Sequence, residues 1–123
     1  MANILIVDDS RTSRKVLRKM IEDAGHTVVE ECSNGEEGYL KYKELKPDLV
    51  TMDITMPKLD GLEALQLIIK SDEDAKVIMI TAASQKEKMI QAIKYGASEF
   101  IAKPYDSEDV KQAINKVLKL QNT

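Results

Sequence analysis

Short hydrophobic runs alternate along the chain with longer segments in which hydrophobic residues recur at helical spacing. The runs are rich in Ile, Val and Leu, and they occupy residues 4–7, 28–29, 49–52, 77–80 and 100–102. They lack the clean alternation of apolar and polar residues that marks a half-buried strand, which is typical of strands buried on both faces of a sheet. The pattern therefore predicts five strands, each followed by a helix.

The first two helices have clear end signals. The first helix is followed by Gly25, a residue suited to the left-handed conformation at a helix C-terminus. Its apolar face comprises Leu17, Met20, Ile21 and Ala24. The second helix is expected to begin near Asn34, whose spacing to Glu37 resembles that of a capping box. It must end at Lys46, because the residue before a proline, here Pro47, avoids the helical region.

The other three helices differ in how much of their surface is apolar. Residues 61–69 are apolar on nearly every side, which predicts a well-buried third helix over the sheet. The fourth helix, residues 85–95, is closed by Gly96, and the fifth begins near Ser107 with Asp106 or Ser107 as its cap. The inward faces are expected to be Met89, Ala92 and Ile93 in the fourth helix, and Val110, Ala113, Ile114, Val117 and Leu118 in the fifth.

Strict alternation of strands and helices calls for right-handed crossovers and a parallel sheet with helices on both faces. We therefore predict a doubly wound α/β fold. The length of 123 residues suits one compact domain and leaves no room for a second, so residues 1–123 are expected to form a single domain. The second strand ends in Glu31, Cys32 and Ser33, without a candidate site residue of the kind that follows the other strands. This difference places it at an edge of the sheet.

Composition and charge narrow the class of protein. The chain is 43% hydrophobic and 32% charged, as is ordinary for a globular domain, and 18 basic against 21 acidic residues give a net charge of −3. This balance argues against binding to nucleic acid, which usually requires a basic face. Cys32 is the only cysteine, the N-terminus lacks the features of a signal peptide, and every apolar run is far shorter than the roughly 20 residues of a membrane span. We expect a cytoplasmic protein that does not enter a membrane.

Residues with reactive or ligating side chains follow four of the five predicted strands. Asp8 and Asp9 follow the first strand, Asp53 the third, Thr81 the fourth and Lys103 the fifth. Ligands of open α/β sheets bind outside the carboxyl ends of the strands. The sequence therefore predicts a site at this edge of the sheet.

The three aspartates predict a metal site. If their strands are neighbours about 4.8 Å apart, the carboxylates crowd, and two charges at about 4 Å repel by roughly 4 kcal/mol. Such a cluster needs a cation or must partly protonate, and carboxylate and carbonyl oxygens suit Mg²⁺. The absence of a nearby histidine or cysteine disfavours zinc. The alternatives are that Asp8 and Asp9 form a solvated turn that caps the first helix, and that Asp53 merely starts a loop.

Lys103 has the reach to join this cluster. With one strand between them, it lies roughly 10 Å from Asp53, a span that a lysine can cover with a mobile positive charge. Thr81 offers a hydroxyl on the intermediate strand. The simpler alternatives are an exposed Lys103, a Thr81 hydroxyl bonded locally, and a Phe100 packed in the core. His26 is expected to be a surface residue away from this edge.

Taken together, the ordered motifs resemble a known family. They are the Asp8–Asp9 pair, the segment Val-Thr-Met-Asp-Ile-Thr-Met-Pro at residues 50–57, Thr81–Ala82, and Phe-Ile-Ala-Lys-Pro at residues 100–104. Each motif is weak alone, but over the whole chain the set strongly resembles the receiver domain of two-component response regulators. The resemblance implies a flavodoxin-like (βα)5 fold whose five parallel strands have the order 2-1-3-4-5.

The resemblance also implies roles for the acidic residues. Asp53 would be the phosphoacceptor. Asp9, Asp53 and the backbone carbonyl of Thr55 would bind Mg²⁺, and Asp8 would support the water shell of the metal. Phosphoryl transfer needs positioning and neutralisation of charge more than covalent help from the protein, which agrees with this assignment.

Further residues would read or tune the phosphoryl group. Lys103 would pair with it, Thr81 would be the switch hydroxyl that moves toward it, and Phe100 would be the aromatic residue that swings inward behind Thr81. Thr55 and Ala83 occupy positions that tune hydrolysis of the acyl phosphate in this family. By the resemblance, the chain catalyses only its own phosphorylation and dephosphorylation and is otherwise not an enzyme.

The resemblance is strongest to stand-alone chemotaxis regulators of the CheY type. It implies a histidine kinase as phosphodonor, and a protein target, such as the flagellar switch protein, bound by the fourth helix, fifth strand and fifth helix. A separate output domain is not expected, a phosphatase is a further candidate partner, and the protein should be a monomer.

One alternative function stays open at this point, and the sequence disfavours two others. A phosphorelay intermediate, which passes its phosphoryl group to a second histidine protein, shares every site residue. A phosphatase of the haloacid dehalogenase type would need a second acid two residues after its nucleophile, but Thr55 follows Asp53 at that spacing and Ser10 follows Asp8. A flavodoxin-like cofactor binder would need a phosphate-binding loop after the first strand, where the acids would instead repel phosphate.

Overall fold

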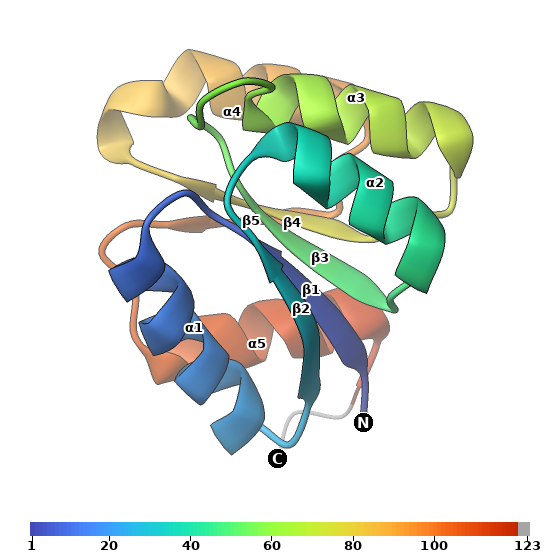
Figure 1. Cartoon of the computed structure of the whole chain (residues 1–123). Helices are drawn as coiled ribbons and strands as arrows, with labels where there is room; N and C mark the ends of the chain where they lie inside the picture. Colours follow the sequence, from blue (N-terminus) through green and yellow to red (C-terminus); the bar gives the residue numbers. More distant parts are fainter. Residues whose placement is uncertain (121–123) are drawn as a thin grey trace.

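The computed structural model describes residues 1–120 as a parallel sheet with helices on both faces (Figure 1). The strands are β1 (Asn3–Val7), β2 (Thr27–Cys32), β3 (Leu49–Asp53), β4 (Val77–Thr81) and β5 (Glu99–Ala102). The helices are α1 (Arg11–Asp23), α2 (Gly35–Leu45), α3 (Gly61–Ser71), α4 (Lys86–Lys94) and α5 (Ser107–Leu118), and a short 3-10 helix, η1 (Ala83–Gln85), precedes α4. The strand order is β2-β1-β3-β4-β5, which confirms the predicted topology and the edge position of β2.

The sheet separates two hydrophobic cores. Helices α2, α3 and α4 cover one face, and α1 and α5 cover the other (Figure 1). Successive residues of β1 supply the two cores in turn: Leu5 and Val7 join the first, and Ile4 and Ile6 join the second. All four side chains are at most 1% exposed, so β1 is buried on both faces as its composition predicts.

The predicted ends of the first two helices are confirmed, apart from one side chain. Gly25 follows α1 with a φ angle of +93°, a conformation that glycine adopts without a steric cost. Asn34 caps α2 by accepting a hydrogen bond from the N–H of Glu37, and the helix ends before a left-handed Lys46. The carboxylate of Glu37 accepts from the N–H and the hydroxyl of Ser33 at 2.9 and 3.0 Å, instead of completing a capping box. Ser33 offers two adjacent donors, which accounts for this choice.

Helices α3 and α4 are more exposed than predicted. Leu67 lies on the solvent side of α3 and is 36% exposed, so the helix is amphipathic and not buried on every side. In α4, Ala92 is fully buried as predicted, but Ile93 is 50% exposed, and the prediction that it points inward is wrong. The helix packs against the core through Ala92 and the partly buried Met89, and the side chain of Ile93 lies outside this contact. In α5 the predicted inward face is confirmed, with Asp106 as the cap.

The residue before strand β2 differs from the prediction. The strand itself continues through Glu30 and Glu31 to Cys32, in agreement with its expected end. His26 is not a surface residue: it is 8% exposed, and its Nδ1 accepts a hydrogen bond from the N–H of Ala2 at 3.0 Å. Burial lowers the pKa of His26, and the nearby N-terminal ammonium adds to this effect. A neutral imidazole therefore ties the start of the chain to β2.

No helix within residues 1–120 has the length and apolar character that a membrane span requires.

Candidate functional site

Three aspartates meet at the carboxyl ends of β1 and β3. These two strands are neighbours in the sheet, with Val7 opposite Met52, so the residues that follow each strand come together. Carboxylate oxygens of Asp8, Asp9 and Asp53 all lie within 4.8 Å of one another. Asp8 is 1% exposed and Asp53 is 7% exposed, while Asp9 faces solvent. The predicted crowding of carboxylates is therefore confirmed.

The cluster is electrostatically unfavourable without a cation. Burial raises the pKa of Asp53 above its usual value, the neighbouring Asp8 raises it further, and Lys103 partly offsets both effects. Burial likewise raises the pKa of Asp8, against a hydrogen bond of 2.8 Å from the N–H of Ser10. The Oδ2 atom of Asp8 is buried and has no hydrogen-bond partner among the described residues. A set of carboxylate oxygens with an unpartnered buried atom fits a hard divalent cation.

The two alternative interpretations of these aspartates, a solvated capping turn and the start of a loop, do not fit the structure. Asp8 is buried and not part of a solvated turn, and α1 is capped by Ser10, whose side chain accepts from the N–H of Ser13. Asp53 is the last residue of β3 and is buried close to Asp8 and Asp9, so it belongs to the strand and to the cluster and not to an exposed loop.

Lys103 reaches the cluster from the far side of β4. Its Nζ lies 3.5 Å from Oδ1 of Asp53, although β4 separates β3 from β5 in the sheet. The predicted reach of this lysine is confirmed. One basic side chain thus lies beside the three aspartates. The Lys103–Pro104 peptide bond is cis.

Thr81 ends β4, the strand next to that of Asp53, and Phe100 lies on the adjacent strand β5. Thr81 is buried, and its hydroxyl donates to the carbonyl oxygen of Ala82 at 3.1 Å, which is the local hydrogen bond considered as an alternative. Phe100 is 38% exposed on β5, so a place in the core is wrong for it. Thr81 pairs with Ala102 of β5, and Phe100 lies two residues before Ala102 on that strand.

Gln85 connects two loops of the site, and sequence reasoning did not single it out. Its Nε2 donates to Oγ1 of Thr55, and its Oε1 accepts from the N–H of Ala82 at 2.9 Å. Thr55 and Ala83 are both exposed beside the site. No motif marks Gln85, because its two partners belong to different loops.

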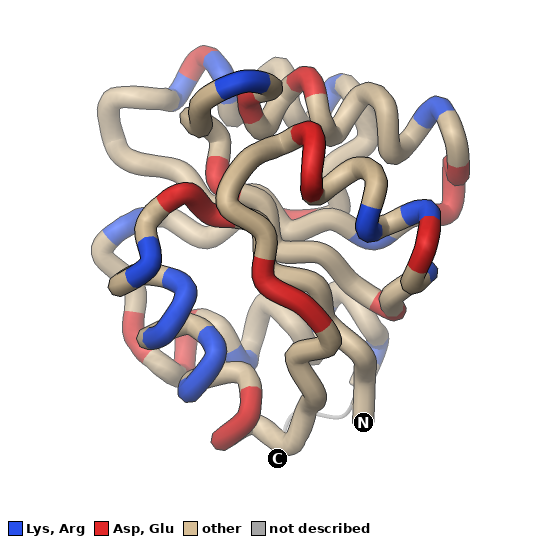
Figure 2. The backbone as a smooth tube through the Cα atoms, viewed as in Figure 1, with Lys and Arg blue, Asp and Glu red and all other residues tan. Residues whose placement is uncertain are grey.

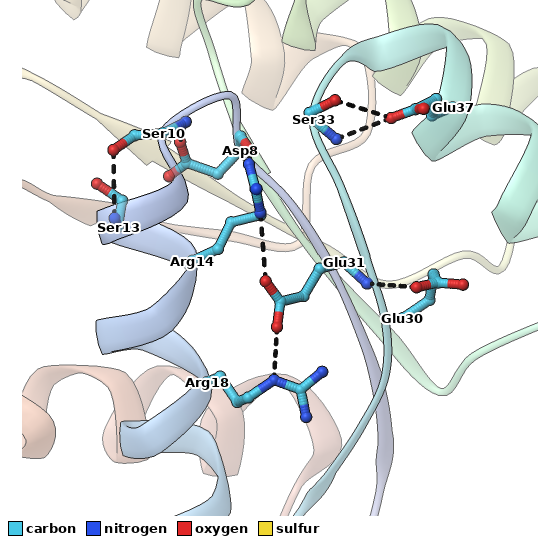
Figure 3. A network of polar contacts seen from close by, with 9 residues as sticks. All are labelled: Asp8, Ser10, Ser13, Arg14, Arg18, Glu30, Glu31, Ser33 and Glu37. Carbon is cyan, nitrogen blue, oxygen red and sulfur yellow. Dashed lines mark hydrogen bonds and ion pairs between the residues drawn. The ribbon is translucent and has the colours of Figure 1, made fainter.

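Arg14 was also missed, although it supports the acidic turn. Its Nη1 donates to the carbonyl oxygen of Asp8 at 2.7 Å, and its Nε donates to Glu31 at 3.2 Å. Arg18 donates to the other oxygen of Glu31, so one carboxylate on β2 holds two arginines of α1 (Figure 3). Figure 2 shows the basic residues along α1 next to the acidic turn. An arginine near the start of an amphipathic helix is a common surface feature, and only the fold reveals its contact with Asp8.

The raised pKa of Asp8 predicts a stability that depends on pH. The folded state holds the proton more tightly than the unfolded state, in which Asp8 titrates near 3.8. The free energy of unfolding therefore falls as pH rises from that value through the raised pKa. At pH about 7 and without divalent cations, Asp8→Asn should unfold several degrees above the wild type, and this advantage should vanish below about pH 4. Thermal unfolding followed by circular dichroism measures the effect.

The exposed Asp74 provides the matched control for this substitution. Asp74→Asn should leave the unfolding temperature unchanged at every pH. A constant difference between Asp8→Asn and wild type across the whole pH range would contradict the assignment of the effect to Asp8 ionisation.

Comparison with known proteins places these features in one family. Residues 4–115 match the response regulator receiver domain. A chemotaxis protein CheY of Thermotoga maritima is 49% identical over 116 residues, which cover 94% of this chain and 97% of that protein. A CheY of Listeria monocytogenes is 46% identical over 119 residues, which cover 97% of this chain and all of that protein.

Comparison with solved structures supports the same family. A chain in the crystal structure of the CheX-CheY-BeF3-Mg complex from Borrelia burgdorferi superposes with a TM-score of 0.90 at 39% identity, covering 94% of this chain and 88% of that one. The sheet order, the three aspartates at the strand ends and the lysine after β5 thus occur in a sequence that matches one family along nearly its whole length. The chain belongs to the response regulator receiver domain family.

Proposed function

We propose that the protein is a chemotaxis response regulator that accepts a phosphoryl group on Asp53 in a Mg²⁺-dependent reaction and signals by binding other proteins. One observation carries the chemistry: a buried Asp53 carboxylate lies between two further aspartates and the Nζ of Lys103, 3.5 Å away. The CheY relatives from Thermotoga maritima and Listeria monocytogenes support the chemotaxis role, and they favour it over a phosphorelay intermediate.

In this proposal the acids form a site for Mg²⁺. Asp9, Asp53 and the backbone carbonyl of Thr55 would hold the ion, and the buried Oδ2 of Asp8 would accept from its water shell. When bound, Mg²⁺ supplies neutralisation of negative charge on the carboxylates and on the transferred phosphoryl group. The site residues position the acceptor oxygen, and the burial of Asp53 limits the access of water to it.

The transfer itself moves one phosphoryl group between two side chains. An oxygen of Asp53 attacks the phosphorus of a phosphohistidine on the donor kinase, the phosphorus–nitrogen bond breaks, and the imidazole leaves with the bonding electrons. The product is an acyl phosphate on Asp53. Lys103 Nζ lies beside an Asp53 oxygen in this structure, so it can form an ion pair with the negative charge of the added phosphoryl group. The protein would thus catalyse its own phosphorylation and dephosphorylation and act on no other substrate.

The phosphoryl group would change the positions of side chains on the neighbouring strands β4 and β5. The Thr81 hydroxyl, which now donates to Ala82, would turn to a phosphoryl oxygen, and Phe100 would move inward from its exposed position. This shift requires that the phosphoryl contacts be better in the active arrangement than in the resting one. Thr55 and Ala83, both exposed beside the site, would tune the hydrolysis of the acyl phosphate.

The proposed output surface is formed by α4, β5 and α5. It exposes large hydrophobic side chains that the core does not use, namely Ile90, Ile93, Tyr95 and Phe100. Partners would be a histidine kinase, a target such as the flagellar switch protein, and a phosphatase. The chain covers 97% and 100% of the length of the two CheY relatives, which supports a protein that acts as one receiver domain. We also propose that the protein is monomeric and cytoplasmic.

Labelling with a small phosphodonor tests the proposed chemistry. Incubation with acetyl phosphate and Mg²⁺ should add the mass of one phosphoryl group to the intact protein, and chelation of the metal should prevent it. Restored reversal of swimming direction in a motile bacterium that lacks its own chemotaxis regulator tests the pathway. Normal labelling without such restoration would contradict the chemotaxis role and leave the chemistry in place.

Asp9→Asn should weaken Mg²⁺ binding by severalfold, because the amide loses the negative charge that an exposed ligand contributes to the metal. Calorimetric titration with MgCl₂ measures the affinity. Asp23, exposed on α1, provides the control, since Asp23→Asn keeps every carboxylate of the site. An unchanged affinity in Asp9→Asn would remove Asp9 from the metal site.

A further inference from the structure

One glutamine side chain joins the two loops that flank Asp53. In the strand pairing, Asp53 lies opposite Ile80. Thr55 and Ala82 each lie two residues beyond this pair, so they stand at matching positions past the carboxyl ends of β3 and β4. The amide of Gln85 spans them: its Nε2 donates to Thr55 Oγ1, and its Oε1 accepts from the N–H of Ala82 at 2.9 Å. We call these two hydrogen bonds the Gln85 bridge.

The bridge occupies hydrogen-bonding groups that would face a phosphoryl group. Each backbone N–H carries a single proton, and that of Ala82 is taken by Gln85. The Ala82 carbonyl accepts from the Thr81 hydroxyl at 3.1 Å and from the N–H of Gln85 at 3.0 Å. Both polar groups of Ala82 are thus held within its own loop, and the hydroxyl of Thr81 is held with them.

Phosphorylation would place new acceptors at this position. A phosphoryl group on Asp53 adds three strong acceptor oxygens and negative charge. On the β4 side, the hydroxyl of Thr81 and the N–H of Ala82 belong to the two residues that directly follow Ile80, the residue opposite Asp53. Neither donor can form a hydrogen bond to the phosphoryl group while it donates its one proton to its present partner.

We propose that Gln85 is a positioning residue whose bridge stabilises the resting arrangement of the β4–α4 loop and opens when Asp53 is phosphorylated. The inference rests on the proposed function of Asp53. The bridge and the phosphoryl group compete for the Ala82 N–H, so the bridge lowers the affinity of the site for a phosphoryl group. Gln85 thereby sets the balance between resting and active states without contacting the reacting atoms.

Binding of beryllofluoride, an analogue of the phosphoryl group, to the Mg²⁺-saturated protein tests this role. Gln85→Met has a similar size but makes neither hydrogen bond. We expect it to bind beryllofluoride about three- to tenfold more tightly than wild type, in line with the net contribution of one or two hydrogen bonds. Isothermal titration calorimetry gives this affinity. The affinity for Mg²⁺ alone should be unchanged, and Gln66→Met, an identical change on the exposed side of α3, should behave as wild type.

Thr55 allows a second, independent test of the bridge. Thr55→Val removes the acceptor of Nε2 and keeps the backbone carbonyl, so it should tighten beryllofluoride binding by about twofold or more. Thr55→Ser keeps the hydroxyl that accepts from Gln85, so it should tighten beryllofluoride binding less than Thr55→Val does. The double variant Thr55→Val with Gln85→Met should bind no more tightly than Gln85→Met alone, because both changes remove the same interaction.

The outcomes separate failure of this inference from failure of the proposed function. If the wild-type protein does not bind beryllofluoride with Mg²⁺, the proposed function of Asp53 is wrong, and this inference is wrong with it. If wild type binds but Gln85→Met and Thr55→Val bind equally or more weakly, the bridge does not oppose the active state. Weaker binding of Mg²⁺ alone in these variants would show instead that Gln85 holds the Thr55 loop for the metal, which also overturns the proposal.

Discussion

Replacing Asp53 with Asn is expected to abolish incorporation of phosphate from acetyl phosphate, down to the background of unlabelled protein. The amide of asparagine is a poor nucleophile and cannot form the acyl phosphate. The rest of the site stays in place, since Asp8 and Asp9 keep their positions on the turn after β1. Intact mass spectrometry of protein incubated with acetyl phosphate and Mg²⁺ measures the loss.

A matched variant and a chemical trap make this test specific. Asp74→Asn is the same change at an exposed position and should label as wild type does. Reduction of the wild-type acyl phosphate with borohydride should convert residue 53 to homoserine, which peptide mapping locates. Labelling of Asp53→Asn at the wild-type level, or a trapped product at Asp8 or Asp9, would contradict the assignment of Asp53 as the acceptor.

Gly61→Ala is expected to destabilise the protein by about 2–4 kcal/mol, because no space exists for a Cβ at the start of α3. An added Cβ would lie 2.0 Å from the carbonyl oxygen of Asp53 and 2.8 Å from Cα of Ile54. Both are backbone atoms, which cannot turn aside as a side chain can. The N–H of Gly61 also donates to the carbonyl of Ile54 at 2.7 Å, so relief of the clash breaks this contact. Urea denaturation followed by circular dichroism measures the loss of stability.

Gly25 provides the control for this substitution. Nothing lies within 4 Å of a Cβ at Gly25, and its φ angle of +93° is the only obstacle to alanine there. Gly25→Ala should therefore cost only about 1–2 kcal/mol and leave phosphorylation unchanged. Gly61→Ala should also slow phosphorylation under conditions where it is folded, because the clash displaces the backbone of Asp53. Equal stability of the two variants would contradict the close approach of α3 to Asp53.

The main parts of the candidate site could be predicted from the sequence, because their positions follow from strand ends. Asp8, Asp9 and Asp53 each come directly after or at the end of a hydrophobic run, and parallel strands bring such ends to one edge. Lys103 could be added because the length of its side chain matches the span of two strand spacings. Family resemblance supplied the strand order that this reach depends on.

Other residues could not be placed by pattern. Phe100 sits in a short hydrophobic run, yet it is 38% exposed on β5, which is an edge strand with a neighbouring strand on one side only. His26 resembled a surface residue, but the return of β2 beside the N-terminus buries it against Ala2. In each case the neighbour that decides exposure lies on another element.

By itself, the sequence determined the five strands, their alternation with helices, most helix ends and the identity of the acidic residues at the strand ends. These features depend on residues within a few positions of one another, through periodicity, capping and turn preferences. Only the tertiary structure decided that Arg14 holds the backbone of Asp8, that Gln85 links Thr55 to Ala82, and that Gly61 abuts Asp53. The partners in the Gln85 and Gly61 contacts come from segments that meet only when the sheet assembles, and Arg14 meets Asp8 only when α1 packs back over its own strand.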